Sequence, residues 1–165
     1  MKNEEFIKLH ERDDVRQLAL KAHSVEGIDL PYCLDQIAGR QMAMRKLPSW
    51  AAVDSIVYPP HISMEQCSSE PTALYKNSVL DRLHSSLFTL HSSLIIDLTG
   101  GFGVDFSFMS RGFSKAVYVE RQQHLCDVAR YNFGCLVLDN VEVVCDEAES
   151  YLASCTKADV IYLDP

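Results

Sequence analysis

Acidic residues and glycines form the most informative pattern in this 165-residue chain. An acid closes or directly follows each of four apolar runs in the C-terminal half, at Asp97, Glu120, Asp146 and Asp164. Three glycines follow the first acid, at Gly100, Gly101 and Gly103. Short apolar runs are typical of buried parallel strands, and clustered glycines permit a tight turn at which backbone approaches a ligand closely. The pattern predicts a nucleotide-type ligand loop after the first strand.

The second acid supports this interpretation. Glu120 ends the apolar run Val117–Glu120, twenty residues after Gly100. A carboxylate at this spacing can accept hydrogen bonds from both hydroxyls of a ribose. The glycine loop and Glu120 together therefore indicate a ligand that contains a nucleoside.

The residues around the loop discriminate between two kinds of ligand. A dinucleotide loop requires a third glycine for close packing of helix on strand, and Phe106 occupies that position. Asp97 and Asp105 place carboxylates on both sides of the position that a diphosphate would take. These acids favour a cationic ligand, and a nicotinamide-dependent oxidoreductase remains as the less favoured alternative.

At this point the residues resemble the class I S-adenosylmethionine (SAM) methyltransferases, whose first motif is an acid followed by a glycine-rich loop. The resemblance covers residues 94–165, including Val141–Asp146 as a third strand with its acid and Ala158–Pro165 as a fourth. It departs from the family pattern at Thr99, where many members have a glycine. The segments Thr99–Asp105, Val119–Arg121 and Tyr162–Pro165 look most like bacterial RNA-modifying members, including the small-subunit ribosomal RNA guanine-N2 methyltransferases.

The resemblance implies a role for each residue of the pattern. Glu120 would hold the ribose, Asp146 the adenine amino group, and the backbone of Thr99–Gly103 the methionine end of SAM. Asp97 would favour the cationic ammonium or sulfonium by its charge. The implied cofactor-binding residues are Asp97, Thr99, Gly100, Gly101, Gly103, Glu120, Asp146 and Thr72.

Asp164 is the implied catalytic residue, because its carboxylate would accept a hydrogen bond from an exocyclic amine of the methyl acceptor. RNA is the implied acceptor. The family motif continues with a second proline and an aromatic residue, and the sequence given ends at Pro165. We therefore expect this chain to carry the cofactor-binding half of such an enzyme. A non-catalytic interaction module that retains the fold is the other alternative.

The elements that must position these residues alternate along the chain. Helices are expected at 104–111, 122–133 and 147–154, between the four apolar runs. Such short connections favour parallel strands joined by right-handed crossovers, which is an α/β, Rossmann-like sheet of about four strands. A small helical domain is expected to precede it, with residues 1–60 as the first domain and 61–165 as the second.

Further helices are expected at 32–47 and 71–87, the second beginning after a Ser69 cap. In the methyltransferase family the segment before the glycine loop often folds over the cofactor. We therefore predict that Glu70, Thr72 or Tyr75 lines the cofactor cleft, with a simple capped connecting helix as the alternative.

Composition limits the class of protein. An apolar fraction of 47% with 23% charged residues describes a globular protein, and no apolar run approaches the roughly 20 residues of a membrane span. The six cysteines form no Cys-x-x-Cys pair, so neither a metal site nor a disulfide framework is expected. The N-terminus lacks the apolar core of a signal peptide, which favours a cytoplasmic location.

The net charge of −8 is unevenly distributed, with −2 in residues 1–93 and −6 in residues 94–165. Such a field does not attract a polyanion in general, so an RNA substrate requires a local basic surface. Arg40, Arg45 and Lys46 form the most basic patch of the chain. This patch is either a solvated helix face or a phosphate contact.

Overall fold

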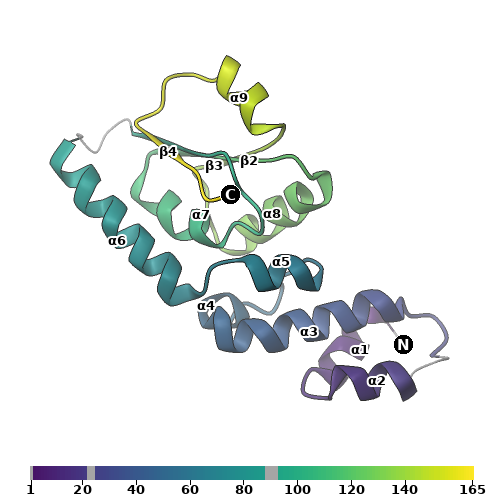
Figure 1. Ribbon diagram of the computed structural model, residues 1–165. Helices are drawn as coiled ribbons and strands as arrows, with labels where there is room; N and C mark the ends of the chain where they lie inside the picture. The colour runs from purple at the N-terminus through teal and green to yellow at the C-terminus, as the bar shows by residue number, and fades with distance from the viewer. Residues whose placement is uncertain (1, 22–24, 88–92) are drawn as a thin grey trace. The chain divides into compact units, whose positions relative to one another are not determined.

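The computed structural model describes residues 2–21, 25–87 and 93–165. The chain divides into two compact units, Met1–Gln66 and Cys67–Pro165. The sequence places the boundary at residues 60 and 61, six residues earlier. Each unit has its own core and is described by itself (Figure 1).

The first unit is helical. Its helices are α1 (Asn3–His10), α2 (Val15–Lys21), α3 (Leu30–Lys46), α4 (Pro48–Ala51) and α5 (His61–Gln66). Helix α3 begins after Asp29, whose carboxylate accepts a hydrogen bond from the backbone N–H of Tyr32 at 3.1 Å. The core contains Phe6, Leu18, Cys33 and Ile37. Trp50 is also buried, at 1% exposure, as expected for a packing role.

The segment around Tyr58 is an ordered part of this helical unit. The amide of Gln36 donates to the Tyr58 carbonyl at 2.8 Å and accepts from the Tyr58 N–H at 2.9 Å. Tyr58 packs so closely on α3 that a Cβ at Gly39 would lie 2.4 Å from the Tyr58 Cβ. Two hydrogen bonds and this contact hold the segment against the helix.

The second unit alternates helices and strands. Its elements are α6 (Glu70–Leu87), β1 (Leu94–Asp97), α7 (Val104–Met109), the 3₁₀ turn Ser110–Gly112, β2 (Lys115–Glu120), α8 (Gln123–Cys135), β3 (Val141–Cys145), α9 (Ala148–Ser154) and β4 (Val160–Tyr162). The helix ends lie within two residues of those predicted.

The four strands form one parallel sheet in the order β3-β2-β1-β4. Ile96 of β1 aligns with Val117 of β2 on one side and with Ile161 of β4 on the other. The chain builds outward from β1 through β2 to β3 and then returns to the opposite side of β1 for β4. The predicted α/β, Rossmann-like fold with a helical N-terminal portion is confirmed.

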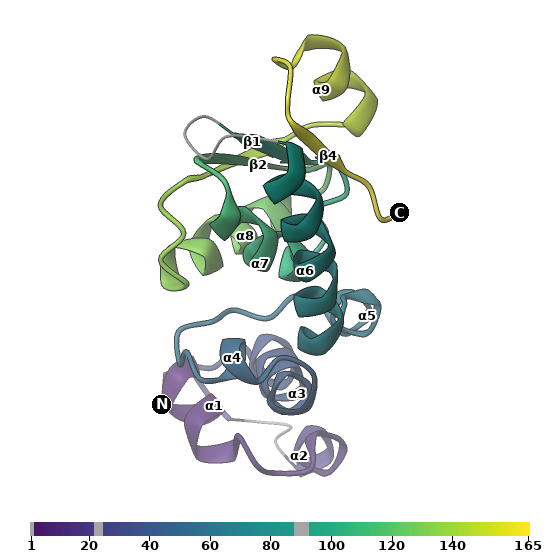
Figure 2. The ribbon, with the colours of Figure 1, turned by 90° about the vertical axis from the view of Figure 1, so that its left-hand side faces the viewer.

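Helices cover both faces of this sheet, with α7 and α8 on one face and α9 on the other (Figure 2). On the α9 face, Ile96, Leu98, Val117 and Val119 form an apolar cluster. On the opposite face, the ring of Phe106 lies 5.7 Å from Tyr118 and 5.4 Å from Phe133. Phe106, at the position of a dinucleotide loop's third glycine, therefore fills the space between α7 and the sheet.

Helix α8 ends differently from the prediction. The sequence predicts a helix over 122–133 that stops before Gly134, but Gly134 lies inside α8, and Val137 takes the left-handed conformation at φ 56°. The N–H of Leu138 donates to the Phe133 carbonyl at 3.0 Å, and that of Val137 to the Gly134 carbonyl at 3.1 Å. These two bonds form a Schellman motif, in which glycine is the usual residue at the left-handed position.

We predict that Val137→Gly stabilises the chain, because a β-branched residue is strained at positive φ and Val137 is 70% exposed. The free energy of unfolding, measured by urea denaturation with circular dichroism, should rise by about 1 kcal/mol. Val137→Ala is the matched control, since alanine removes the side chain but still disfavours positive φ. An alanine variant as stable as the glycine variant would contradict the backbone explanation.

Candidate functional site

The carboxyl ends of the four strands form the candidate site. The Leu98 N–H donates to the Tyr162 carbonyl at 3.1 Å, and the Gly100 N–H to the Val119 carbonyl at 3.0 Å. The segment after β1 is therefore held to both neighbouring strands as it leaves the sheet. The strand order reverses at β1, because β2 and β3 lie on one side of it and β4 on the other, and open parallel sheets bind ligands at such a point.

The glycine loop follows β1 and uses its glycines in two ways. Gly101 and Gly103 have positive φ angles of 54° and 83°, which side chains disfavour. Gly100 allows a close approach, since a Cβ there would lie 2.4 Å from the Tyr118 ring. The Tyr118 hydroxyl also donates a hydrogen bond to the Gly101 carbonyl. The loop is thus fixed by the aromatic residue of β2 beneath it.

Asp97 is the buried acid of the site, with 2% exposure. Its Oδ1 accepts hydrogen bonds from the Thr99 N–H at 2.8 Å and the Thr99 hydroxyl at 3.2 Å. Burial raises the pKa of Asp97 to about 7; the bonds from Thr99 oppose this rise, and the nearby charges of Asp105 and Asp164 add to it. Asp97 therefore changes its charge near neutral pH.

Glu120 joins the end of β2 to the glycine loop. Its Oε2 accepts a hydrogen bond from the Gly101 N–H at 3.0 Å, and its Oε1 accepts one from the Gln122 N–H at 2.9 Å. Each carboxylate oxygen can accept more than one hydrogen bond, so both oxygens retain capacity for the hydroxyls of a ligand.

Asp146 directly follows β3, and its N–H donates to the Glu120 carbonyl at 3.1 Å. The backbone therefore brings these two predicted residues together at neighbouring strand ends. The carboxylate of Asp146 accepts from the Glu147 N–H at 2.8 Å. Thr72 has a different setting, since it is exposed at the start of α6 and its hydroxyl lies 2.8 Å from that of Ser69. Its predicted contact with a cofactor stays a prediction.

The structure adds a residue that sequence reasoning missed. Lys76 of α6 extends its ammonium to Asp105 Oδ2 at 2.8 Å and to Asp164 Oδ2 at 2.6 Å. It also donates to the Ser68 hydroxyl at 2.9 Å, and the Tyr162 hydroxyl donates to both acids. The only sequence signal was its place in the segment expected to fold over the cofactor, since its partners lie 29 and 88 residues away.

This lysine changes the electrostatics predicted from the acids. Burial alone would lower the pKa of Lys76, but its hydrogen bonds to Asp105 and Asp164 raise the pKa overall. The same hydrogen bond holds the pKa of the Asp164 carboxyl below its usual range. Asp105 and Asp164 thus have a cation supplied by the chain itself. Among the described residues, the hydrogen bonds to the Asp97 carboxylate come from Thr99.

Thr99 connects these groups. Its hydroxyl donates to Asp97 Oδ1 at 3.2 Å and accepts from the Asp164 N–H at 2.8 Å. The residue that departs from the family pattern therefore links the acid after β1 to the acid after β4.

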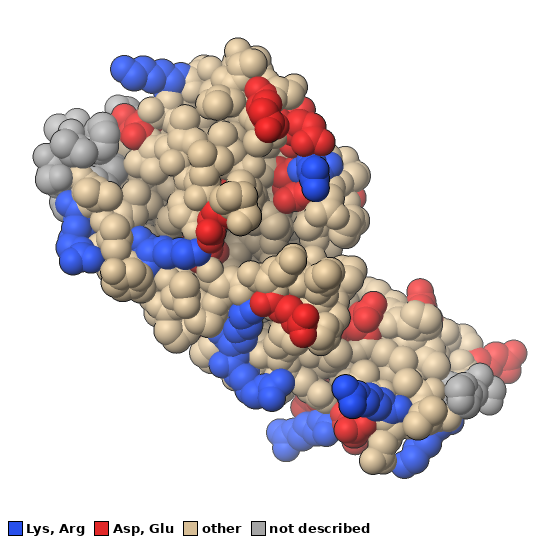
Figure 3. Space-filling view, in the orientation of Figure 1, with Lys and Arg blue, Asp and Glu red and all other residues tan. Residues whose placement is uncertain are grey.

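Basic side chains lie in both units, and Figure 3 shows blue and red atoms interspersed on one face. In the first unit Arg40 pairs with Asp54 at 2.7 Å, and Lys46 donates to the carbonyls of Met64 and Glu65 at 2.9 and 2.7 Å. Two of the three residues of the predicted basic patch, Arg40 and Lys46, therefore have partners within their own unit. The third, Arg45, is exposed.

No group of three or more metal-ligating side chains occurs in residues 2–21, 25–87 and 93–165. No helix in these ranges is both long and apolar enough to cross a membrane.

Comparison with known proteins identifies relatives by structure. No protein-family model and no curated protein sequence matches the chain. A protein from Porphyromonas gingivalis W83 assigned as a methyltransferase has a TM-score of 0.71 and 25% identity, over 92% of this chain and 36% of that one. A protein from Klebsiella pneumoniae assigned as an O-methyltransferase has a TM-score of 0.52 and 17% identity, over 92% and 59%. The chain thus spans about a third of the length of the first protein.

A third match covers part of the chain. A protein from Streptococcus mutans assigned as a methyltransferase, solved in complex with SAH (S-adenosylhomocysteine), has a TM-score of 0.43 and 21% identity. This likeness covers 51% of this chain and 45% of the other.

We predict that the burial of Asp97 makes stability depend on pH. Because its pKa is about 7 in the folded chain and about 3.9 when unfolded, the folded state keeps a proton that the unfolded state releases. The free energy of unfolding should fall as pH rises between these values, by about 4 kcal/mol at most. Asp97→Asn should lack this fall. Denaturation of both proteins at several pH values tests it, and parallel pH profiles would contradict the assignment.

Proposed function

We propose that this chain, which has the class I methyltransferase fold, binds S-adenosylmethionine and forms the cofactor-binding half of a methyltransferase acting on RNA. Residues 61–165 would carry the site. The observation that carries the proposal concerns Glu120 at the end of β2. Its carboxylate accepts a hydrogen bond from the Gly101 N–H and can accept further hydrogen bonds from two ribose hydroxyls. An RNA acceptor also agrees with the cytoplasmic location expected from the sequence.

The residues at the strand ends suit this cofactor. Gly101 offers space, since the nearest atom to a Cβ built there is the Thr99 carbonyl oxygen at 3.8 Å. Asp97 supplies a buried acid toward a cationic ligand, and Asp146 lies beside Glu120 where the adenine would extend. A dinucleotide loop needs a glycine at the position of Phe106 so that the helix can pack closely on the strand. Here the Phe106 ring fills the space between α7 and the sheet.

Each residue then has a defined task. The bound cofactor would supply an activated methyl group, so the protein chiefly has to align the acceptor with it. Glu120 would hold the ribose, and the backbone of Thr99–Gly103 would hold the methionine end. An ionised Asp97 would stabilise the positive charge of the ligand, which couples ligand binding to release of its proton.

Asp164 is proposed as the residue that meets the acceptor. Its carboxylate would accept a hydrogen bond from an exocyclic amine and so orient the nitrogen lone pair. Support for RNA as acceptor comes from the motif resemblance of Thr99–Asp105 and Tyr162–Pro165. The charge of −6 in residues 94–165 implies that phosphate contacts lie elsewhere.

We predict that the chain binds S-adenosylhomocysteine in calorimetric titration and does not bind NAD. Glu120→Gln should weaken binding by about tenfold or more, because it removes the charge from hydrogen bonds to the ribose. Glu142→Gln is the control, since Glu142 pairs with Lys115 away from the loop. NAD binding without S-adenosylhomocysteine binding would favour an oxidoreductase instead.

The ribose role can be isolated with a ligand variant. The 3′-deoxy analogue of S-adenosylhomocysteine should bind the wild type more weakly than the parent compound does. This difference should shrink in Glu120→Gln, because the hydrogen-bonding partner of that hydroxyl is altered. An unchanged difference would remove Glu120 from the ribose site.

We predict methyl transfer to RNA and a specific loss in Asp164→Ala. The chain is incubated with SAM carrying a labelled methyl group and with RNA, DNA or protein fractions, and the labelled RNA is digested to nucleosides. We expect label on a base amine, reduced at least a hundredfold in Asp164→Ala with S-adenosylhomocysteine affinity retained. If wild type that binds S-adenosylhomocysteine labels DNA or protein but not RNA, the acceptor assignment is wrong. If it binds S-adenosylhomocysteine but labels nothing, the chain alone does not transfer the methyl group, and its proposed role is limited to binding the cofactor.

A further inference from the structure

We propose that Lys76 is a positioning residue, which fixes the carboxylate of Asp164 so that one oxygen faces the methyl acceptor. This inference rests on the acceptor role proposed above for Asp164. It assigns a function to α6, the helix that precedes the glycine loop.

The contacts of Asp164 show an anchored group. Its backbone N–H donates to the Thr99 hydroxyl at 2.8 Å, which fixes the main chain just after β4. Its Oδ2 accepts from the Lys76 ammonium at 2.6 Å and from the Tyr162 hydroxyl at 3.3 Å. The hydrogen bonds from described side chains thus fall on one oxygen, and Oδ1 retains its capacity to accept. A carboxylate held in this way presents a defined oxygen to an incoming amine.

Asp164 needs such an anchor. Its side chain is 54% exposed, and it follows β4, a three-residue strand at one end of the sheet order. An exposed carboxylate after a short strand can rotate freely, and misplacement of a reacting group by about 1 Å costs roughly a hundredfold in rate. The ammonium removes this freedom at the oxygen that is not required for the acceptor.

Lys76 is itself held in place. Its side chain is 26% exposed and its ammonium also contacts Asp105 Oδ2, on a side chain that is 13% exposed. Ser68 donates to the same Asp105 oxygen at 2.9 Å, and α6 packs against α7. A lysine with a partly buried partner and a packed helix behind it provides a more rigid support than a lysine on an open surface.

The charges around Asp164 come from four elements. Lys76 belongs to α6, Asp105 to α7, Tyr162 to β4, and Asp97 ends β1. Lys76 is the cation of this group; its hydrogen bond and its charge lower the pKa of Asp164, whereas partial burial raises it. Removal of the lysine should therefore raise the pKa of Asp164.

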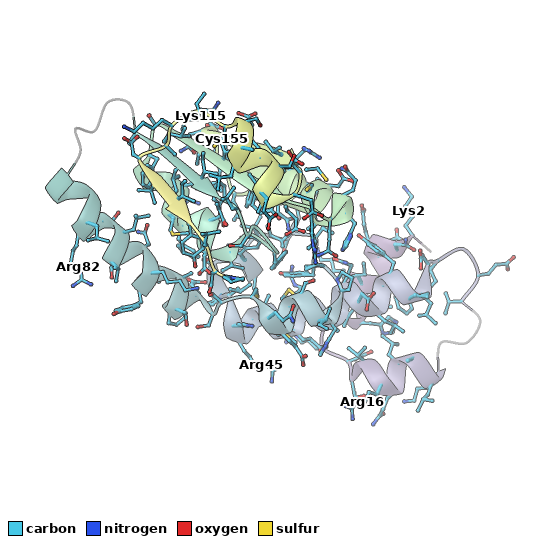
Figure 4. The ribbon with its side chains drawn as sticks, turned by 45° about the horizontal axis from the view of Figure 1, so that its top comes forward. Lys2, Arg16, Arg45, Arg82, Lys115 and Cys155 are labelled. Atoms are coloured by element: carbon cyan, nitrogen blue, oxygen red, sulfur yellow. The ribbon has the colours of Figure 1, made fainter. Side chains whose placement is uncertain are left out.

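The test is a carboxyl ¹³C NMR titration of the whole chain in the wild type, Lys76→Met, Lys76→Arg and Lys115→Met. We expect the pKa of Asp164 to rise toward its usual range in Lys76→Met and to stay low in Lys76→Arg, which restores the cation. Lys115→Met is the matched control, because Lys115 pairs with Glu142 at 2.9 Å. Lys115 lies at the start of β2, away from the carboxyl ends of the strands (Figure 4). This variant should leave Asp164 unchanged.

An Asp164 pKa that is unchanged in Lys76→Met, or equally shifted in Lys115→Met, would overturn the inference. Measurement of S-adenosylhomocysteine affinity distinguishes failure of this inference from failure of the proposed function. We expect this affinity to change less than threefold in Lys76→Met. A tenfold loss would place Lys76 at the cofactor instead and overturn its positioning role. Absence of S-adenosylhomocysteine binding in a folded wild type refutes the proposed function, and with it the reason for orienting Asp164, whatever the titration shows.

Discussion

The parallel pairing of β1 with two neighbours is the constraint on which the site depends. Because β1 lies between β2 and β4, the residues that follow β1 lie between Glu120 at the end of β2 and Asp164 after β4. Backbone hydrogen bonds continue past the strand, from Leu98 to Tyr162 and from Gly100 to Val119. The start of the loop is therefore fixed to both neighbouring strands. The glycines then allow the positive φ angles that the turn requires.

The strands and the acids at their ends could be predicted because both are local properties of the sequence. An apolar run of four to six residues followed by an acid is visible without any tertiary information, and short connections between such runs favour parallel strands. Lys76 could not be predicted in the same way. Its partner Asp164 lies 88 residues away, and no spacing along the chain shows that the first turns of α6 meet the residues after β4. The sequence predicted two acids beside a ligand loop, and folding provided the lysine that pairs with them.

The local rule for the end of a helix failed at α8, where it competed with tertiary packing. Gly134 satisfied the rule for a helix stop, but the helix continues through it and ends at a left-handed Val137. Phe133 packs on Tyr118 of the sheet, with ring centroids 5.4 Å apart, so tertiary contacts hold the last turn of α8. Packing of a buried ring is worth more than the strain of one exposed residue at positive φ.

Thr99 gives the departure from the family pattern a physical reason. A glycine at this position would supply the N–H that Asp97 receives, but it has no hydroxyl to accept from the Asp164 N–H. The hydroxyl joins the buried acid to the exposed one, and so the cofactor side of the proposed site is connected to its acceptor side. A cation bound near Asp97 would favour its ionised form, which accepts the Thr99 hydroxyl more strongly. Since that hydroxyl also accepts from the backbone of Asp164, ligand charge on one side of the site would strengthen the support for the carboxylate on the other.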